Sequence, residues 1–503
     1  MTRLADVVGA SEQVAATSAR SAKVAVLAEL LRRLEPAEVR IVVGFLSGVP
    51  RQGRIGVGYS TIHALPTHGA SQPSLSILDA DRAIAEVQVA SGSGSAARRR
   101  QILTALFERA TELEAAFLRG LFTGELRQGA LTGVMTDAVA RAAGVPLALA
   151  RRGLMLSGDL GCTAEIALGT GEPGLREIGI EIFRPMLPML AGTATDVAEA
   201  VLSFTLSSVE WKLDGIRVQI HRRGEEVRIY TRNLNEITGA LPGIVDAVRA
   251  LPVDQVVLDG EALWMGEEGP AAFQDTVSQI DRDAPPEGIV TFLFDLLHLD
   301  GEDLLDAPLV DRAARLESIA AHLRIPSVTT SDPREAERVL EEALAAGHEG
   351  VVVKDTSSAY AAGRRGGAWR KVKPVQTYDL VVLAAEWGHG RRRGWLSNLH
   401  LGARDRNGGF VMVGKTFKGL TDELLAWQTE ALLARETGRS GIAVLVRPEL
   451  VVEIALDGVQ TSTRYAGGVA LRFARVKRYR SDKAPSEADT IEDLRALLPA
   501  RSR

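Results

Sequence analysis

The sequence predicts a multidomain protein with an all-α N-terminal part, an α+β middle part and a C-terminal β-barrel. Its 503 residues are enough for about three domains of roughly 150 residues each. Apolar residues recur every three or four positions before about residue 185, and strand-like runs dominate after residue 209. Two prolines and a glycine within residues 183–196 predict a linker between the two regions. We therefore expect domains at 1–185, 186–374 and 375–503.

The N-terminal part is predicted to be helical. The stretches "AKVAVLAELLRRLEPAEVRIVVGFLSG" and "RRRQILTALFERATELEAAFLRGLFTG" have amphipathic helical spacing, and "SGSGSAARRR" precedes the second. Gly124, Gly129 and Gly133 lie between later helical segments. Glycine turns at such places can present backbone N–H groups to a phosphate, or they can simply end helices. The stretch alone leaves both interpretations open.

The middle part alternates strands with helices. Strand-like runs include "VEWKLDGIRVQIHRRG", "VDQVVLDGEALW", "GIVTFLFDLLHLDG" and "EGVVVKD", and "SDPREAERVLEEALAAG" is a capped helix. This pattern ends near Pro374. The remainder has five short strands and one strong helix, "TDELLAWQTEALLAR", in about 115 residues, which fits a small barrel such as an OB-fold.

Charge and cysteine content narrow the class of protein. The net charge is −5, but residues 360–373 hold five cations and no acid, and residues 472–483 hold six cations and one acid. Such clusters suit a polyanionic ligand, although many charge runs are only solvated faces. Cys162 is the single cysteine, so intrachain disulfides and a cysteine-built zinc site are excluded. The N-terminal sequence lacks an apolar signal segment, and we expect a cytoplasmic protein.

The segment "KLDGIR" breaks the pattern of a half-buried strand. Lys212 is costly to desolvate there, and the Asp-Gly pair at 214–215 is a turn signal that should interrupt the strand. A lysine becomes a nucleophile when burial or neighbouring cations lower its pKa. For an isolated K-x-D-G, a lysine with a packed stem and a solvated head is the better interpretation.

The motif is not isolated. K-x-D-G-x-R, from Lys212 to Arg217, resembles the nucleotidyltransferase motif shared by ATP-dependent DNA ligases, RNA ligases and mRNA capping enzymes. The other motifs of that superfamily follow in order and at compatible spacing: "YTRN" with Arg232, "LDGEALW" with Asp259 and Glu261, "FLFDLLHLDG" with Phe294 and Asp295, "EGVVVKD" with Glu349 and Lys354, and "AGRRGGAWRKVKP" with Arg364, Arg365, Lys371 and Lys373.

The resemblance extends over nearly the whole chain. "RSDK" at 480–483 looks like the R-x-D-K element of the ligase OB domain, and "PMLPMLA" with the helical N-terminal region resembles three-domain DNA ligases of archaeal and bacterial type. The resemblance implies a helical DNA-binding domain, an adenylation domain and an OB-fold. It is most specific in the middle domain and diffuse in the N-terminal region.

The resemblance also implies roles for the site residues. Lys212 would attack the α-phosphate of ATP and become lysyl-AMP, Glu210 would contact adenine, and Phe294 would stack on it. Arg217 and Arg232 would meet ribose or phosphate oxygens, where a planar fork of donors is useful. Without the motif context, the arginines would be ordinary surface residues, the glutamate a solvated carboxylate, and Phe294 a core residue.

The same resemblance implies metal and phosphate ligands. Glu261 and Glu349 would be linked to Mg²⁺, which needs only one or two carboxylates when phosphates complete its shell. Arg365, Lys371 and Lys373 would neutralise charge on the phosphate during transfer. The two lysines alternate in a predicted strand and should point to one face, as they would in a solvated edge strand.

The implied reaction seals nicks in duplex DNA during replication, repair or recombination. AMP would pass to the 5′-phosphate at a nick, and the 3′-hydroxyl would then expel it. We expect ATP and Mg²⁺ as cofactors, nicked duplex DNA as partner, no membrane association and a monomer.

Three other functions compete with this interpretation. An RNA ligase or GTP-dependent capping enzyme shares the motifs but would not need about 185 helical N-terminal residues. A non-catalytic nucleic-acid-binding relative should have lost Lys212, which is present. No G-x-G-x-x-G opens a βαβ unit, which excludes a dinucleotide oxidoreductase. Arg370 and His298 depart from the usual motif residues, and Arg370 leaves the register of Lys371 less certain.

Overall fold

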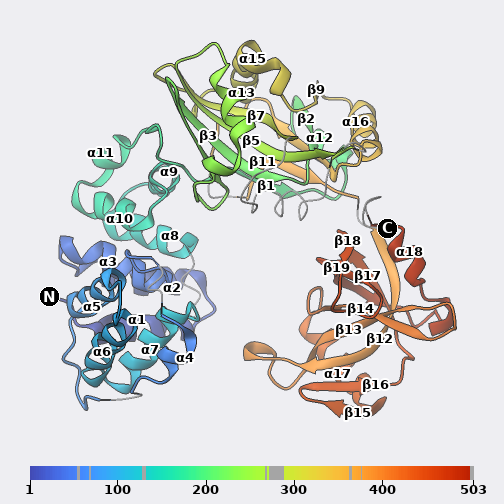
Figure 1. Cartoon of the computed structure of the whole chain (residues 1–503), viewed down its shortest axis with the longest axis horizontal. Coiled ribbons are helices and arrows are strands. Elements are labelled where there is room, and N and C mark those ends of the chain that lie inside the picture. Colours follow the sequence, from blue (N-terminus) through green and yellow to red (C-terminus); the bar gives the residue numbers. More distant parts are fainter. Residues whose placement is uncertain are drawn as a thin grey trace.

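The chain folds into three parts. The computed structural model describes residues 1–53, 57–66, 69–126, 132–266, 269–270, 288–361, 365–374 and 376–498. In Figure 1 the helical N-terminal part and the strand-rich C-terminal part both lie on the same side of the middle part. No helix in these ranges is long and apolar enough to cross a membrane.

The N-terminal part consists of helices around one apolar core, which includes Leu27, Phe45 and Phe107. Residues 127–131, and Gly129 with them, lie outside the described ranges. The helices are α1 (Leu4–Ala16), α2 (Arg20–Arg32), α3 (Pro36–Ser47), α4 (Tyr59–His63), α5 (Ile77–Val89), α6 (Ser95–Glu108), α7 (Glu112–Thr123), α8 (Thr132–Ala143), α9 (Leu147–Ser157), α10 (Leu160–Gly169) and α11 (Gly171–Arg176).

Helix α7 illustrates why the sequence sets these boundaries. The Thr111 side chain accepts a hydrogen bond from Glu114 N, and the Glu114 carboxylate accepts one from Thr111 N, which is a capping box. The helix ends at Gly124, whose φ of +71° is readily adopted by glycine. Gly124 therefore ends a helix here, which is one of the two roles considered for it.

The middle part contains two sheets with helices packed on them. The five-stranded sheet has the order β1-β11-β10-β2-β9, and the six-stranded sheet has the order β4-β3-β5-β7-β8 with β6 beside β5. The elements are β1 (Leu190–Thr193), α12 (Val197–Leu202), β2 (Ser207–Lys212), β3 (Ile216–Arg223), β4 (Glu226–Thr231), α13 (Pro242–Arg249), β5 (Gln255–Gly266), β6 (Gly269–Pro270), β7 (Ile289–Leu299), β8 (Glu302–Asp303), α15 (Leu309–Ala320), β9 (Ser327–Thr330), α16 (Pro333–Ala345), β10 (Gly350–Asp355) and β11 (Arg365–Val372).

The K-x-D-G segment connects the two sheets. Strand β2 ends at Lys212 and β3 begins at Ile216, so the Asp-Gly pair does interrupt the strand. A Cβ at Gly215 would lie 2.3 Å from Ala262 O and 2.9 Å from Glu261 Cγ, so any larger residue would displace the backbone of β5. This close approach requires glycine and puts the end of β2 beside the acidic residue of β5.

The connection between the helical and middle parts is more ordered than the expected linker at 183–196. Residues 190–193 form β1, which pairs with β11 in parallel. Residues 183–189, which we call the interdomain strap, are held by alternate side chains of β3, which face one side of the strand. The bonds are Arg217 Nη1 to Met189 O at 2.7 Å, Met186 N to Gln219 Oε1 at 2.8 Å and Phe183 N to His221 Nδ1 at 3.0 Å.

His221 should make the strap sensitive to acid. Burial, with a smaller contribution from His298, lowers its pKa from 6.5 to about 3. Below pH 6.5 the His221 ring binds a proton in the unfolded chain but stays neutral in the folded chain. The free energy of unfolding therefore decreases as the pH falls. From the unfolded pKa we expect a loss of about 2 kcal/mol at about pH 5.

Urea unfolding at pH 7 and pH 5 checks this expectation. His221→Gln should lose less stability than wild type between these pH values, whereas His322→Gln, at an exposed position, should behave like wild type. Equal pH dependence in wild type and His221→Gln would contradict the assignment.

The C-terminal part is a strand-rich unit with more strands than the sequence indicated. A main sheet runs β14-β13-β12-β16-β15, with β17 pairing with β12 and β20, and β18 pairs with β19. The elements are β12 (Gln376–Trp387), β13 (Leu396–Arg404), β14 (Phe410–Thr416), α17 (Asp422–Leu433), β15 (Glu436–Ser440), β16 (Ala443–Val446), β17 (Val451–Leu456), β18 (Gly458–Thr461), β19 (Val469–Arg472), β20 (Arg475–Tyr479) and α18 (Ile491–Arg495).

Candidate active site

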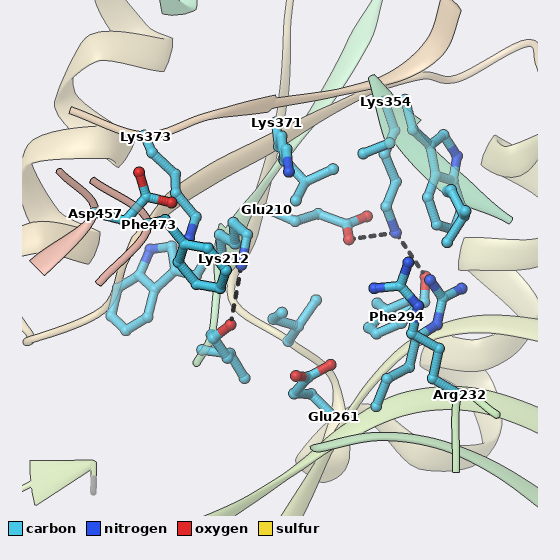
Figure 2. Close-up of a pocket in the computed structure, with 18 of the residues that line it drawn as sticks. Glu210, Lys212, Arg232, Glu261, Phe294, Lys354, Lys371, Lys373, Asp457 and Phe473 are labelled. Atoms are coloured by element: carbon cyan, nitrogen blue, oxygen red, sulfur yellow. Dashed lines mark hydrogen bonds and ion pairs between the residues drawn. The ribbon is translucent and has the colours of Figure 1, made fainter. Parts of the chain in front are cut away.

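A cavity of about 640 Å³ lies between the two sheets of the middle part and is also lined by the C-terminal part (Figure 2). The five-stranded sheet contributes residues from β2, β10 and β11, and the six-stranded sheet contributes residues from β3, β5 and β7. Arg365 begins β11, but its side chain and all of Arg364 lie outside the described residues. The cavity brings together these predicted site residues: Glu210, Lys212, Arg217, Arg232, Glu261, Phe294, Lys371 and Lys373.

Lys212 is held by Glu349, which precedes β10. The two carboxylate oxygens of Glu349 pair with different ammonium groups, Oε2 with Lys212 Nζ and Oε1 with Lys373 Nζ. Burial raises the pKa of Glu349, but the two lysines outweigh burial and lower it overall. An ammonium group has no lone pair for attack, so Lys212 must lose its proton before it can act as a nucleophile.

Glu261 faces the same space from β5. Burial is the main cause that raises its pKa to about 7, with Asp259 and Asp214 acting in the same direction. Lys212 and Arg217 oppose this shift. Near neutral pH this carboxylate is therefore close to its midpoint, and a cation bound beside it would displace the proton.

Arg217 is fixed before any ligand binds. Its Nε and Nη2 donate to the two oxygens of Asp259 at 3.0 and 2.6 Å, and its Nη1 donates to Met189 O. Tyr360 Oη donates to Asp259 at 2.7 Å. The guanidinium carbon lies 5.3 Å from the centroid of the Phe294 ring. These bonds connect the cavity wall to the interdomain strap.

Phe294 belongs to an aromatic corner of the cavity. Its ring meets the ring of Trp369 edge to face, with centroids 6.1 Å apart. Lys354 Nζ lies 4.6 Å from the Phe294 centroid and 4.2 Å from the Trp369 centroid. The same ammonium group pairs with Glu210 Oε2 at 2.5 Å. Figure 2 shows Lys354 and Glu210 facing one another on one side of the cavity, with Lys212 further along it.

The other predicted cations lie at the end of β11 and in the turn after β4. Lys371 and Lys373 line the cavity, while Val372 between them is 3% exposed and packs in a core, as strand alternation predicts. Arg232 is an exposed residue in the turn after β4 and also lines the cavity. The site thus combines a lysine, further cations, carboxylates and an aromatic wall.

Family comparisons assign all three parts of the chain. The family model described as "ATP dependent DNA ligase domain" matches residues 188–373, "ATP dependent DNA ligase C terminal region" matches 392–483, and "DNA ligase N terminus" matches 57–140. A "Probable DNA ligase" of Saccharopolyspora erythraea is 55% identical over 500 residues, covering 99% of this chain and 98% of the relative. A "Probable DNA ligase" of Pseudarthrobacter chlorophenolicus is 53% identical, covering 98% and 99%.

The chain belongs to the ATP-dependent DNA ligases. The resemblance to these ligases is thereby confirmed, and the RNA ligase or capping enzyme alternative is not favoured. The solved structure "Pmar-Lig_PreS3" aligns with a TM-score of 0.63 at 19% identity, covering 94% of the ligase and 99% of that chain. At this identity the likeness supports the fold, here a helical region, a central adenylation domain and a strand-rich C-terminal domain.

The C-terminal domain of the ligase also lines the cavity. Arg472 Nη1 pairs with Asp214 Oδ2 of the K-x-D-G segment at 3.2 Å. The "RSDK" element lies elsewhere: Arg480 and Lys483 both pair with Asp379, at 2.9 and 2.6 Å. The C-terminal residues that line the cavity are Lys418, Asp457, Phe473 and Arg475.

Sequence reasoning missed part of this lining. Lys354 belongs to a motif for which the sequence implies no role at this position, and nothing local distinguishes Trp369 from a core residue. The aromatic-rich sequence "AWRK" and the buried lysine of "VVVKD" were available signals, but only the pairing of β10 with β11 and β2 brings them to Glu210. For the C-terminal residues the sequence held no comparable signal, because their position depends on how the domains pack.

Proposed function

We propose that the ligase seals nicks in duplex DNA through a covalent lysyl-AMP intermediate on Lys212. The observation that carries this proposal is the position of Lys212 at the end of β2, inside the cavity. Other cations lie near this lysine, and the Glu210 carboxylate and the aromatic corner lie further along the cavity. Such a cavity suits a nucleotide, with its phosphates by the lysine and its base in the corner. An oriented nucleophile gains much of its rate from position alone.

In the first step the amine of Lys212 attacks the α-phosphorus of ATP. A P–N bond forms, the bond to the pyrophosphate oxygen breaks, and the amine loses a proton. Glu210 and Phe294 contact the base, where an acceptor suits the adenine amine and a ring suits its face. Arg217 and Arg232 contact ribose or phosphate oxygens. Charge that builds on the phosphate is neutralised by Arg365, Lys371 and Lys373.

We assign Mg²⁺ binding to Glu261 and Glu349. Two carboxylates are enough for Mg²⁺ when nucleotide phosphates and water complete its coordination. The donors fit a hard cation, because both are carboxylates and both face the lysine that must meet the phosphate. A bound Mg²⁺ would supply charge neutralisation for the phosphates. Glu349 would then exchange its lysine partners for the metal.

Glu349→Gln tests the metal assignment. We expect AMP transfer to Lys212 to slow by roughly 100-fold and to need more Mg²⁺, because the amide removes one ligand charge and leaves Lys212 and Lys373 without their shared carboxylate. The rate of adduct formation across a Mg²⁺ series measures both effects. Glu199→Gln is a control, since Glu199 is half exposed, its ion pair with Arg370 is long at 3.6 Å, and a glutamine oxygen can still accept the hydrogen bond from Thr195 N. An unchanged Mg²⁺ dependence in Glu349→Gln would contradict the assignment.

The later steps need DNA beside the cavity. AMP passes from Lys212 to a 5′-phosphate at a nick, and the 3′-hydroxyl attacks that phosphate and expels AMP. We propose domain bounds of 1–185, 186–374 and 375–503, supported by the end of α11 at Arg176 and the start of β12 at Gln376. We also propose that the C-terminal domain is an OB-fold, a fold that commonly binds nucleic acid. A monomeric state and a cytoplasmic location stay predictions.

The helical domain and the basic C-terminal segments are expected to bind DNA mainly through contacts with its phosphates. Such contacts release counterions, so affinity for a nicked duplex should fall by about 1,000-fold between roughly 50 and 200 mM salt, with little dependence on sequence. Binding and sealing measured over a salt series with two unrelated duplexes check this. Salt-independent binding, or a strong preference for one duplex, would contradict it.

Intact-mass analysis tests the proposed function most directly. After incubation with ATP and Mg²⁺, the wild-type ligase should gain the mass of one AMP, and subsequent addition of nicked duplex DNA should remove that mass as sealed product forms. A protein that never gains the adduct would refute the proposal. Incubation with GTP in parallel tests the capping-type alternative.

A further inference from the structure

Lys354 is a fully buried lysine at the aromatic corner of the cavity. Its side chain is 2% exposed, and Nζ also donates to Phe294 O at 3.2 Å. Burial of an ammonium group is costly unless it is paired, and this one is paired with Glu210 and flanked by the faces of Phe294 and Trp369. None of the steps of the proposed reaction assigns it a role.

Glu210 depends on this partner. Its side chain is 6% exposed, and apart from Lys354 it is contacted by the hydroxyl of Ser208, which donates to Oε1 at 3.1 Å. Burial raises the pKa of Glu210 overall, and Lys354 is the largest influence that limits this rise. Asp295 and Arg312 also face it, but they form a bidentate ion pair with each other.

Strand pairing explains why these two side chains meet. In the antiparallel pair of β2 and β10, Lys354 lies opposite Ser208 and Glu210 lies opposite Val352. Glu210 and Lys354 are thus diagonal neighbours on one face of the sheet, within reach of long side chains. Both also line the cavity, so the pair forms part of its wall.

We propose that Lys354 is a positioning residue that keeps Glu210 an ionised hydrogen-bond acceptor and so sets the preference for adenine over guanine. This inference rests on the proposed function, in which Glu210 contacts the base. Adenine offers an amine donor to an acceptor at that position, whereas guanine offers a carbonyl oxygen that an ionised carboxylate repels. A protonated or amide side chain could instead donate to the guanine oxygen. Sites built this way discriminate strongly, because the wrong base leaves buried polar groups unpaired.

The test compares ATP with GTP as nucleotide donor to the full chain. Wild type and Lys354→Met are incubated with Mg²⁺ and either nucleotide, and the rates of covalent transfer are followed by intact mass. We expect Lys354→Met to lower the ratio of kcat/KM for ATP to that for GTP by about 10-fold or more, chiefly through KM. A ratio within about two-fold of wild type would overturn the inference. A wild type without any adduct would instead refute the proposed function, so the two failures are distinguishable.

A second pair of variants covers the case in which Lys354→Met folds poorly. Glu210→Gln alone should also lower the ratio, and Glu210→Gln with Lys354→Met contains no unpaired buried charge. If Lys354 acts through Glu210, the double variant has the same ratio as Glu210→Gln. A further drop of about 10-fold in the double variant would overturn the inference, because it would show an effect of Lys354 that is independent of Glu210.

Discussion

Replacing Lys212 by alanine is expected to abolish both the AMP adduct and the ATP-dependent sealing of nicked DNA. The cavity is also lined by Lys371 on β11 and by Lys373 just after it, but the proposed attack requires the amine at the end of β2. Loss of the nucleophile removes a covalent intermediate, which neighbouring cations cannot replace. Intact mass and gel-based sealing assays measure the two losses.

Matched variants distinguish the role of Lys212 as a nucleophile from the effect of its positive charge. Lys212→Arg keeps the positive charge beside Glu349 but supplies a guanidinium that stays protonated, so it should also form no adduct. Both variants should still seal a nick that already carries AMP on its 5′-phosphate, since that last step uses the 3′-hydroxyl as nucleophile. Arg338→Ala, at an exposed position of α16, should behave like wild type. An adduct on the Lys212→Ala protein would refute the assignment.

Local sequence predicted the elements of the fold well where the signal itself is local. The helical periodicity and caps of the N-terminal part lead to α1–α11, and the Asp-Gly pair does end β2. The C-terminal part was less predictable. Strand β15 (Glu436–Ser440) is mostly exposed and carries no apolar alternation, so backbone pairing with β16 maintains it. A strand of this kind cannot be predicted from the pattern of apolar residues in the sequence.

The candidate site was predictable as a set of residue types but not as a network. Strand alternation predicted that Lys371 and Lys373 share a face. The partners of these residues follow from long-range packing instead: Glu349 between two lysines, Arg217 on Met189, and Lys354 on Glu210. No local sequence pattern encodes these pairs, because the two members of each pair are far apart in the chain. The separation ranges from 24 residues, for Lys373 with Glu349, to 144 residues, for Lys354 with Glu210.

Asp295 illustrates how a motif residue can have a structural role. It follows Phe294 in β7, and its two carboxylate oxygens accept from Arg312 Nε and Nη2 at 2.7 and 3.0 Å. Both side chains are 0% exposed. Arg312 Nη1 also donates to Ala307 O and to Ser358 O, the latter at 3.0 Å. The pair therefore connects α15 to the strand that carries Phe294 and to the residues after β10.

Arg312→Met is expected to lower the free energy of unfolding of the middle domain by about 3–5 kcal/mol, because it leaves Asp295 as a buried charge without its partner. Urea unfolding followed by tryptophan fluorescence measures this, since Trp369 lies in the same part of the fold. Arg315→Met on the same helix is the matched control: its partner Glu302 is 59% exposed, and solvent can replace the lost pair. Replacing both Asp295 and Arg312 by leucine and methionine should recover much of the loss, since apolar side chains need no partner. If Arg312→Met and Arg315→Met destabilised the ligase equally, the buried pair would not be what fixes β7 against α15.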